Sequence, residues 1–168
     1  MWRDHLSAQL ERPIRGVHTL HTETIVPASI DRTFAFFSDA RNLEQLTPPW
    51  LRFRIMTPQP IAMAAGTLID YRIAVYGVGI PWRTRIDEWE PGVRFVDRQI
   101  AGPYLWWRHD HRFEAVDGGT RVIDRVEFLP RAAMLSGWLV RRDVSRIFAF
   151  RHSVLAQFLP ADGTDRCV

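Results

Sequence analysis

Two histidines, His109 and His111, stand two positions apart in the segment WWRHDHRFEAV, residues 106–116. Side chains alternate between the two faces of a β-strand, so both imidazoles are expected on the same face. Trp107 and Phe113 share that face, while the charged residues between them point the other way. Imidazoles in such a place can ligate a metal ion, transfer a proton or bind a polar ligand.

Further polar residues are expected on the same apolar face. Asp97 and Gln99 belong to one neighbouring strand, and Asp124 belongs to the other. A turn at Gly118-Gly119 sets His111 opposite Val126, which makes His111 and Asp124 diagonal neighbours about 7–8 Å apart at the backbone. We expect their side chains to meet.

Arg151 is expected to approach this group from a helix. The apolar residues of the C-terminal segment recur at helical spacing and form one stripe (Val140, Val144, Ile147, Phe148, Val154, Leu155 and Phe158). At 100° per residue, Arg151 falls within about 20° of the centre of that stripe. A helix packed on the sheet therefore directs one guanidinium toward Asp124. It also predicts that Phe148 and Phe158 are largely buried.

Three interpretations of the polar residues stay open. Buried ionisable groups cost several kcal/mol unless they are paired, so the group is either a satisfied cluster that fixes the helix on the sheet or the polar end of an aromatic pocket. His109, His111 and Asp124 also have the ligand types that Zn²⁺ or Fe²⁺ prefers. Because Arg151 would repel a cation, we predict neither a metal nor another cofactor.

The elements that position these residues follow from periodicity and turn signals. Residues 17–26 are predicted to form a strand, 27–46 two short helices with the second at 39–46, and 50–56 an alternating strand. Five more strands are predicted at 67–75, 81–90, 93–100, 104–116 and 120–129, followed by a helix at 134–158. Short loops between consecutive strands give an antiparallel meander, and the whole is an α+β domain.

The turns predict the strand register. A turn at Pro91-Gly92 sets Glu88 opposite Phe95 and Ile86 opposite Asp97, and a loop at 76–79 sets Tyr71 opposite Thr84. The turns agree on one inner face. That face carries the apolar residues Ile69, Tyr71, Ile73, Trp82, Ile86, Phe95, Trp107, Phe113, Val122, Val126 and Phe128. Arginines occupy the opposite face, where Trp89 and Trp106 are expected to stack on them or to mark a homodimer contact.

Length and composition indicate one folded domain. The chain has 168 residues, of which 46% are hydrophobic and 24% charged, which is ordinary for a soluble globular protein. We divide it into an N-terminal extension at 1–16 that could form a short helix, a domain at 17–160 and a polar tail at 161–168.

Several classes of protein are disfavoured. No stretch approaches the roughly 20 apolar residues of a membrane span, no apolar signal-peptide core begins the chain, and the single Cys167 rules out a disulfide framework. A cytoplasmic protein that is not integral to a membrane is expected. The net charge is only +3, and the basic residues, all arginine, are spread along the strands. We therefore expect no nucleic-acid partner.

The chain from about 17 to 158 resembles the START-like, or Bet v 1-like, superfamily (SRPBCC), within it the bacterial polyketide cyclase/dehydrase and lipid-transport group. The resemblance is carried by IVPASIDRTFAFFSDARNLEQLTPPW, GPYLWWRHDHRF, GGTRVIDRVEFLP and the closing helix. It implies a helix-grip fold, in which a curved antiparallel sheet wraps around the C-terminal helix and leaves a cavity. The group hosts many functions on one scaffold, so no catalytic residue is carried over.

The predicted function is binding of a small hydrophobic or aromatic ligand, lipid or polyketide-like, in that cavity. The alternative is a cyclase, dehydratase or hydrolase in which His111 is the general acid/base, Asp124 orients it and Arg151 stabilises negative charge. A third hypothesis is an interaction module. The candidate ligand-binding residues are Tyr71, Trp82, Asp97, Gln99, Trp107, His109, His111, Phe113, Asp124 and Arg151.

Overall fold

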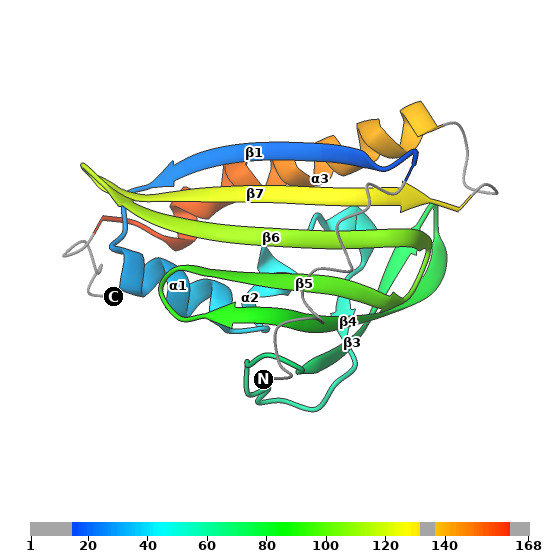
Figure 1. Ribbon diagram of the computed structural model, residues 1–168, viewed down its shortest axis with the longest axis horizontal. Helices are drawn as coiled ribbons and strands as arrows, with labels where there is room; N and C mark the ends of the chain where they lie inside the picture. Colours follow the sequence, from blue (N-terminus) through cyan, green and yellow to red (C-terminus); the bar gives the residue numbers. More distant parts are fainter. Residues whose placement is uncertain (1–14, 132–136, 162–168) are drawn as a thin grey trace, which may run out of the picture.

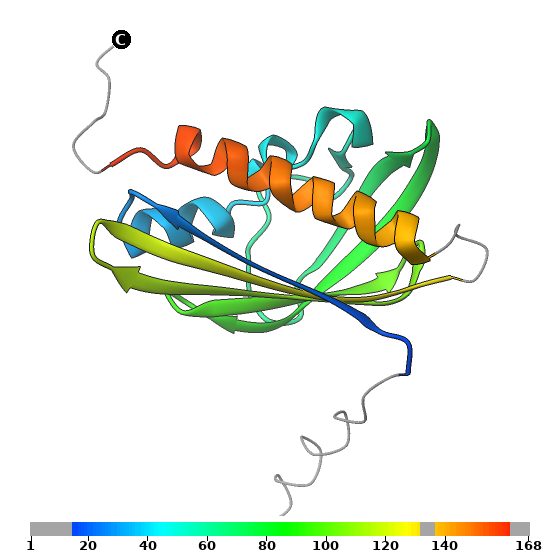
Figure 2. The ribbon, with the colours of Figure 1, turned by 90° about the horizontal axis from the view of Figure 1, so that it is seen from above.

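A curved antiparallel sheet wraps around one long helix in the computed structural model, which describes residues 15–131 and 137–161 (Figures 1 and 2). The seven strands lie in the order β1-β7-β6-β5-β4-β3-β2. The helical elements are α1 (Ile30–Ser38), α2 (Asn42–Gln45), the 3₁₀ turn η2 (Pro49–Leu51) and α3 (Gly137–Phe158). The strands are β1 (His18–Val26), β2 (Arg54–Ile55), β3 (Leu68–Val75), β4 (Val78–Glu90), β5 (Arg94–Ala101), β6 (Tyr104–Val116) and β7 (Gly119–Pro130). The predicted α+β helix-grip architecture is confirmed.

Helix α3 crosses the concave face of the sheet (Figure 2). Its buried residues Val140, Val144, Phe148, Arg151 and Leu155 recur every three or four positions, which is the spacing of one helix face. Phe148 is 3% exposed, as predicted.

The prediction for Phe158 is wrong, because it is 38% exposed at the last residue of α3 and Leu159, the next residue, is buried in its place. Phe158 instead stacks on Phe36 of α1.

The predicted strand at 50–56 is mostly wrong. Only Arg54 and Ile55 pair in the sheet, with Arg72 and Tyr71. Pro49 begins a 3₁₀ turn that ends at Leu51, and the next residue, Arg52, has a left-handed φ of 43°. Proline has no N–H for a strand ladder, and a left-handed residue breaks an extended chain.

Two hairpins have shorter or earlier turns than predicted. Val75 pairs with Val78 around Tyr76 and Gly77, which both have positive φ, and Val116 pairs with Gly119. Such two-residue turns match the twist of the flanking strands. The register therefore shifts by two residues, so Tyr71 lies opposite Trp82 rather than Thr84. A shift of two keeps every side chain on its predicted face.

The β6–β7 register brings the candidate residues closer than predicted. His111 lies directly opposite Asp124, His109 opposite Val126, and Phe113 opposite Val122. The predicted diagonal arrangement of His111 and Asp124 is thus replaced by a direct cross-strand pair.

A β-bulge at Asp87 corrects the predicted place of Trp89. Ile86 lies opposite Asp97 as predicted, but Glu88 pairs with Val96 and Trp89 with Phe95, which leaves Asp87 as the extra residue. Residues beyond a bulge change face relative to a regular strand. Trp89 therefore turns to the inner side, where its ring lies 5.3 Å from that of Phe34.

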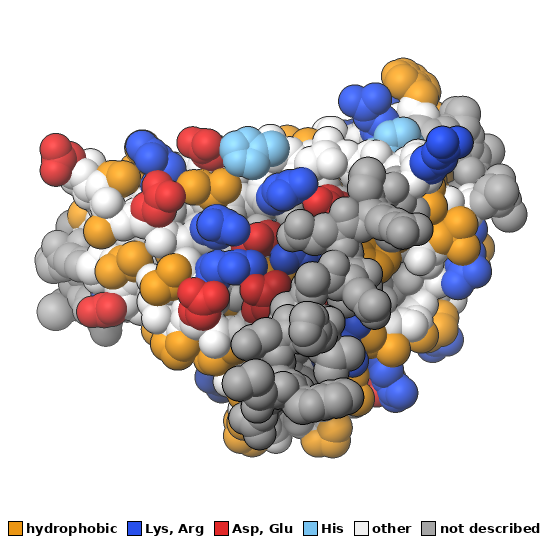
Figure 3. Space-filling model, viewed as in Figure 1, with side chains coloured by type: hydrophobic (Ala, Val, Ile, Leu, Met, Phe, Trp, Pro, Cys, Tyr) orange, Lys and Arg blue, Asp and Glu red, His pale blue; other side chains and the backbone are white. Residues whose placement is uncertain are grey.

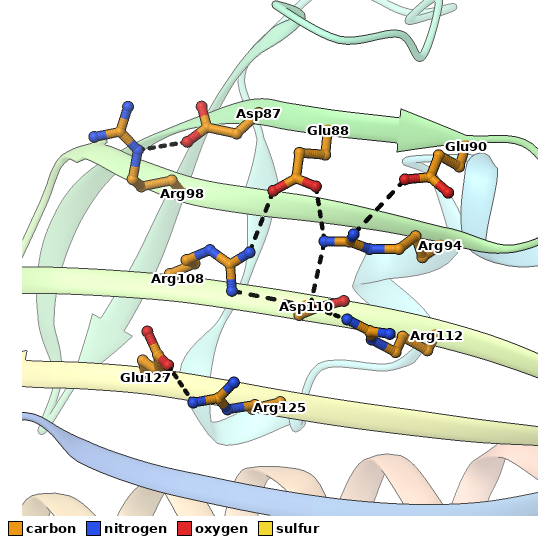
Figure 4. A network of polar contacts seen from close by, with 10 residues as sticks. All are labelled: Asp87, Glu88, Glu90, Arg94, Arg98, Arg108, Asp110, Arg112, Arg125 and Glu127. Atoms are coloured by element: carbon orange, nitrogen blue, oxygen red, sulfur yellow. Dashed lines mark hydrogen bonds and ion pairs between the residues drawn. The ribbon is translucent and has the colours of Figure 1, made fainter. Parts of the chain in front are cut away.

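The outer face of the sheet carries paired charges rather than solvated arginines. Acidic and basic side chains gather over its central strands (Figure 3). Arg94 bridges Glu88 at 2.7 Å and the buried Asp110 at 3.4 Å, and Asp110 also meets Arg108 and Arg112 (Figure 4). Trp106 lies beside Arg98 on this face, as predicted.

The interior consists of two apolar clusters, one toward each end of the sheet. The first includes Phe34, Phe37, Phe95, Phe113 and Leu155, and the second includes Trp82, Tyr104, Val126, Phe128 and Phe148. His111 stacks on Phe95 of the first cluster, and His109 contacts Phe148 of the second. The histidine pair therefore joins the two clusters.

The expected helix within residues 1–16 and the polar tail at 161–168 lie almost wholly outside the described residues. Within the described part of the chain, no helix is long and apolar enough to span a membrane.

Candidate functional site

A cavity of about 1300 Å³ lies between the sheet and α3. Aromatic side chains from α1, four strands and α3 form much of its wall: Phe37, Tyr71, Trp82, Phe95, Trp107 and Phe148. Trp82 donates a hydrogen bond through Nε1 to Thr84 Oγ1 at 3.1 Å, and the Tyr71 hydroxyl lies 3.2 Å from the same oxygen. These bonds satisfy the polar atoms of the two rings, so this part of the wall is apolar toward the cavity.

The two histidines share one carboxylate. Asp124 is 1% exposed on β7, and its Oδ1 lies 2.9 Å from both His109 Nε2 and His111 Nδ1. The alternation of β6 points both imidazoles inward, and the β6–β7 register puts Asp124 beside them. The ring centroids lie 3.6 Å apart.

Asp97 approaches the histidines from the other neighbouring strand. Its Oδ2 lies 3.2 Å from His111 Nε2 and 3.7 Å from His109 Nδ1. The bulge at Asp87 leaves Asp97 paired with Ile86 and His109, and its side chain faces inward. Two carboxylates therefore flank two imidazoles.

Arg151 contributes a buried guanidinium to the cavity wall. The residue is 7% exposed, and within the described residues its side chain makes no hydrogen bond and no ion pair. Its Cζ lies 5.3 Å from the ring centroid of Phe37 and 5.7 Å from that of Phe148. The sequence correctly directs Arg151 toward the sheet, but the direct pair with Asp124 does not form.

The environment separates the pKa values of the two histidines. Burial, with the neighbouring His111 adding to it, lowers the pKa of His109 to about 4. Burial also opposes the charged form of His111, but its bonds to Asp124 and Asp97 outweigh that effect and raise its pKa. Burial works against the Asp124 carboxylate, yet Arg151 and the two histidines hold its pKa well below the usual range.

Seven of the ten candidate residues line the cavity: Tyr71, Trp82, Asp97, Trp107, His109, His111 and Arg151. The other three do not. Gln99 holds the β5–β6 turn, since its Nε2 donates to the Tyr104 carbonyl at 2.8 Å. Phe113 packs in the first apolar cluster, and Asp124 lies behind the imidazoles.

Other lining residues escaped the sequence reasoning. Phe37 shares the helical spacing of Ile30 and Phe34, so that signal was available. Tyr104 could not be placed on the inner face from strand alternation, because a bulge at Leu105 interrupts it. Tyr76 at the β3–β4 turn donates to Asp143 of α3 at 2.7 Å, a contact across 67 positions that no local pattern indicates.

Comparison with known proteins places the fold. Solved structures with similar folds include the ZhuI aromatase/cyclase from Streptomyces sp. R1128, with a TM-score of 0.67 and 17% identity over 85% of this chain and 93% of that one. Ginseng major latex-like protein 151 from Panax ginseng has a TM-score of 0.65 and 7% identity over 86% and 98%. Ara h 8.0201 has a TM-score of 0.62 and 18% identity over 86% and 98%. The fold is thus the Bet v 1-like helix grip that the resemblance implies.

At the level of sequence, no curated protein matches the chain. A family model described as "Domain of unknown function (DUF8410)" matches residues 24–159.

Proposed function

For this chain, which belongs to the family described as "Domain of unknown function (DUF8410)", we propose the binding of a small hydrophobic or aromatic molecule that carries one anionic oxygen group. The body of the molecule lies among the aromatic side chains of the cavity. Its oxygen group pairs with Arg151.

The observation that carries this proposal is the buried guanidinium of Arg151, which makes no hydrogen bond and no ion pair within the described residues. A buried charge normally has a partner, because removal from water costs several kcal/mol. Arg151 faces the rings of Phe37 and Phe148 but has no hydrogen-bond or ion-pair partner among the described residues, and it lies on the wall of a cavity large enough for a drug-sized molecule. An anionic oxygen supplies the missing partner through charge-assisted hydrogen bonds.

A matched pair of fluorescent probes tests this proposal. 8-Anilinonaphthalene-1-sulfonate and N-phenyl-1-naphthylamine share one aromatic body, and only the first carries an anionic oxygen group. We expect both to bind. Arg151→Leu should weaken the sulfonate by about 10- to 150-fold, the worth of a hydrogen bond to a charged group, and should change the neutral probe less than about threefold.

Arg141→Leu is the matched control, because Arg141 is exposed on the same helix and does not line the cavity. It should leave both affinities unchanged. Equal loss of both probes in Arg151→Leu would show that the substitution damages the cavity rather than an anion contact. If neither probe binds and Arg151→Leu lowers the free energy of unfolding by about 3–5 kcal/mol, the polar group is structural and the proposal is wrong.

A second candidate function is acid–base catalysis on the bound molecule. It is favoured by two buried imidazoles that each make a hydrogen bond with a carboxylate at the cavity wall, His109 with Asp124 and His111 with Asp97. In this case a compound that enters the cavity leaves it chemically changed. Mass spectrometry of compounds recovered after incubation separates binding from turnover.

A further inference from the structure

The orientation of the two imidazoles leaves one nitrogen of each ring facing Asp97. Asp124 Oδ1 lies 2.9 Å from His109 Nε2 and from His111 Nδ1, on the side of the rings away from Asp97. The remaining nitrogens, His109 Nδ1 and His111 Nε2, lie 3.7 Å and 3.2 Å from Asp97 Oδ2. His109 Nε2 makes a hydrogen bond with Asp124, whereas His111 Nδ1 lies near the same oxygen without hydrogen-bond geometry, and His111 Nε2 makes its hydrogen bond with Asp97. When both rings carry their proton on the nitrogen next to Asp124, their lone pairs converge on a carboxylate oxygen of Asp97.

Three ligand atoms that converge in this way suit a cation. His109 Nδ1, His111 Nε2 and a carboxylate oxygen of Asp97 all lie within 4.8 Å of one another. Ligands bound at about 2.0–2.2 Å to one metal ion in tetrahedral geometry are separated by roughly 3.3–3.6 Å. The two separations from Asp97 bracket that range, and the third, between the two ring nitrogens, is at most 4.8 Å, so rotations of the side chains can bring the three atoms onto one ion.

We propose that Asp97, His109 and His111 bind one divalent transition-metal ion, with Asp124 orienting both imidazoles. Two histidines and one carboxylate are the ligand set of catalytic zinc and of non-haem iron(II) sites. A carboxylate that accepts the second N–H of a metal-bound histidine is the usual outer partner of such sites. The site goes beyond the proposed ligand binding and does not depend on it.

The structure also corrects the ligand set considered from sequence. The sequence indicates His109, His111 and Asp124 as the possible ligands, and the positive charge of Arg151 argues against a bound cation. In the structure, Asp124 lies on the side of the rings away from Asp97, and Asp97 is the carboxylate next to the other two ring nitrogens. With neutral imidazoles, the two carboxylates and Arg151 sum to one negative charge, which a divalent ion converts to one positive charge. Arg151 therefore does not prevent binding.

With a metal ion bound, the site would prefer ligands that carry an anionic oxygen. Three protein ligands leave at least one coordination position open, and the ligand residues Asp97, His109 and His111 line the cavity. The single positive charge favours an anionic oxygen donor in that position. A molecule whose oxygen group touches both the metal and Arg151 would be held at two points.

Metal binding is tested on the full chain after dialysis against a chelator. Calorimetry with Zn²⁺ should give one equivalent per chain, and Co²⁺ should add visible ligand-field bands without thiolate charge transfer. Asp97→Asn replaces the anionic carboxylate ligand by a neutral amide and should lower the Zn²⁺ affinity at least 100-fold. Asp124→Asn should lower it about 10- to 100-fold, the usual loss for an outer partner. His21→Asn, an exposed histidine of β1, should bind Zn²⁺ like the wild type.

The wild-type chain alone provides a second measurement, which does not require a variant to fold. In the Co²⁺ form, proton NMR should show two exchangeable, paramagnetically shifted imidazole N–H signals, from His109 and His111. Their absence at one equivalent of Co²⁺ would overturn the proposal. So would Zn²⁺ binding weaker than millimolar, or a Zn²⁺ affinity that folded Asp97→Asn leaves unchanged.

Discussion

At the scale of residues, one carboxylate gives two neighbouring histidines different roles. Asp124 Oδ1 contacts both rings at 2.9 Å, but only His111 also lies within 3.2 Å of Asp97. His111 therefore has an acceptor at each nitrogen, which favours its protonated form. Burial governs His109 and favours its neutral form.

We predict that the two histidines of the metal-free protein titrate on opposite sides of pH 6.5. His109 should stay neutral until the pH falls to about 4, because burial lowers its pKa. His111 should take up its proton above pH 6.5. NMR of the imidazole carbons between pH 4 and 9, in the presence of a chelator, measures both pKa values.

Asp124→Asn tests whether Asp124 raises the pKa of His111. Removal of the carboxylate takes away one of the two interactions that outweigh burial, so the pKa of His111 should fall. Identical titration of His111 in both proteins would mean that Asp124 does not control this ring.

Linkage gives the sign of the effect of His109 on stability. Between about pH 6.5 and 4 the unfolded chain binds a proton at this histidine and the folded chain does not. The contribution of His109 to the free energy of unfolding should therefore fall as the pH drops through that range.

At the scale of elements, α3 is held by a few deeply buried side chains. Phe148 is 3% exposed and packs in the second apolar cluster, whereas Phe158 on the same helix is 38% exposed. We predict that Phe148→Ala lowers the free energy of unfolding by about 3–5 kcal/mol. Phe158→Ala should lower it by less than about 1.5 kcal/mol. Urea unfolding of both variants measures the difference, and equal losses would contradict this packing of α3.

The sequence predicts the elements and their faces better than it predicts their pairing. Period-two alternation is strong in β3, β6 and β7, so their inward residues were assigned correctly. The residues that form each turn are harder to predict. Tyr76, for example, has a positive φ, which is usual for glycine or asparagine and uncommon for tyrosine. A bulge adds one residue without any strong local signal, and Trp89 was misplaced for that reason.

The residues of the site could be predicted from the sequence, whereas most of the contacts between them could not. His109, His111, Asp97 and Arg151 follow from strand and helix periodicity. The direct pairing of His111 with Asp124 depends on a two-residue register shift. That Arg151 lines a cavity without an ion pair depends on the three-dimensional placement of α3 over the sheet, which no pattern in the sequence records.

At the scale of the whole molecule, the interior is hollow between the sheet and α3. A cavity of about 1300 Å³ leaves part of the aromatic wall without packing partners. A bound molecule replaces those missing contacts and binds only to the folded chain. Its binding should therefore stabilise the protein.

We predict a large thermal shift on ligand binding. At 100 times its dissociation constant, a ligand specific for the folded state adds about 2.7 kcal/mol. For a chain of this size that corresponds to roughly 5–10 °C in Tm. Thermal unfolding with 8-anilinonaphthalene-1-sulfonate measures the shift, and Arg151→Leu at the same probe concentration should reduce it. An unchanged Tm at saturation would indicate that the probe binds outside the folded interior.

The bulge at Asp87 has a consequence for how the length of this chain can vary. In a regular strand, the loss of one residue turns every later side chain to the opposite face. Asp87 is the extra residue between two paired positions, so its deletion leaves Ile86 and Trp89 facing inward and Glu88 facing outward. Related chains that differ by one residue here can therefore keep the same cavity wall, while a deletion two positions earlier would reverse Ile86.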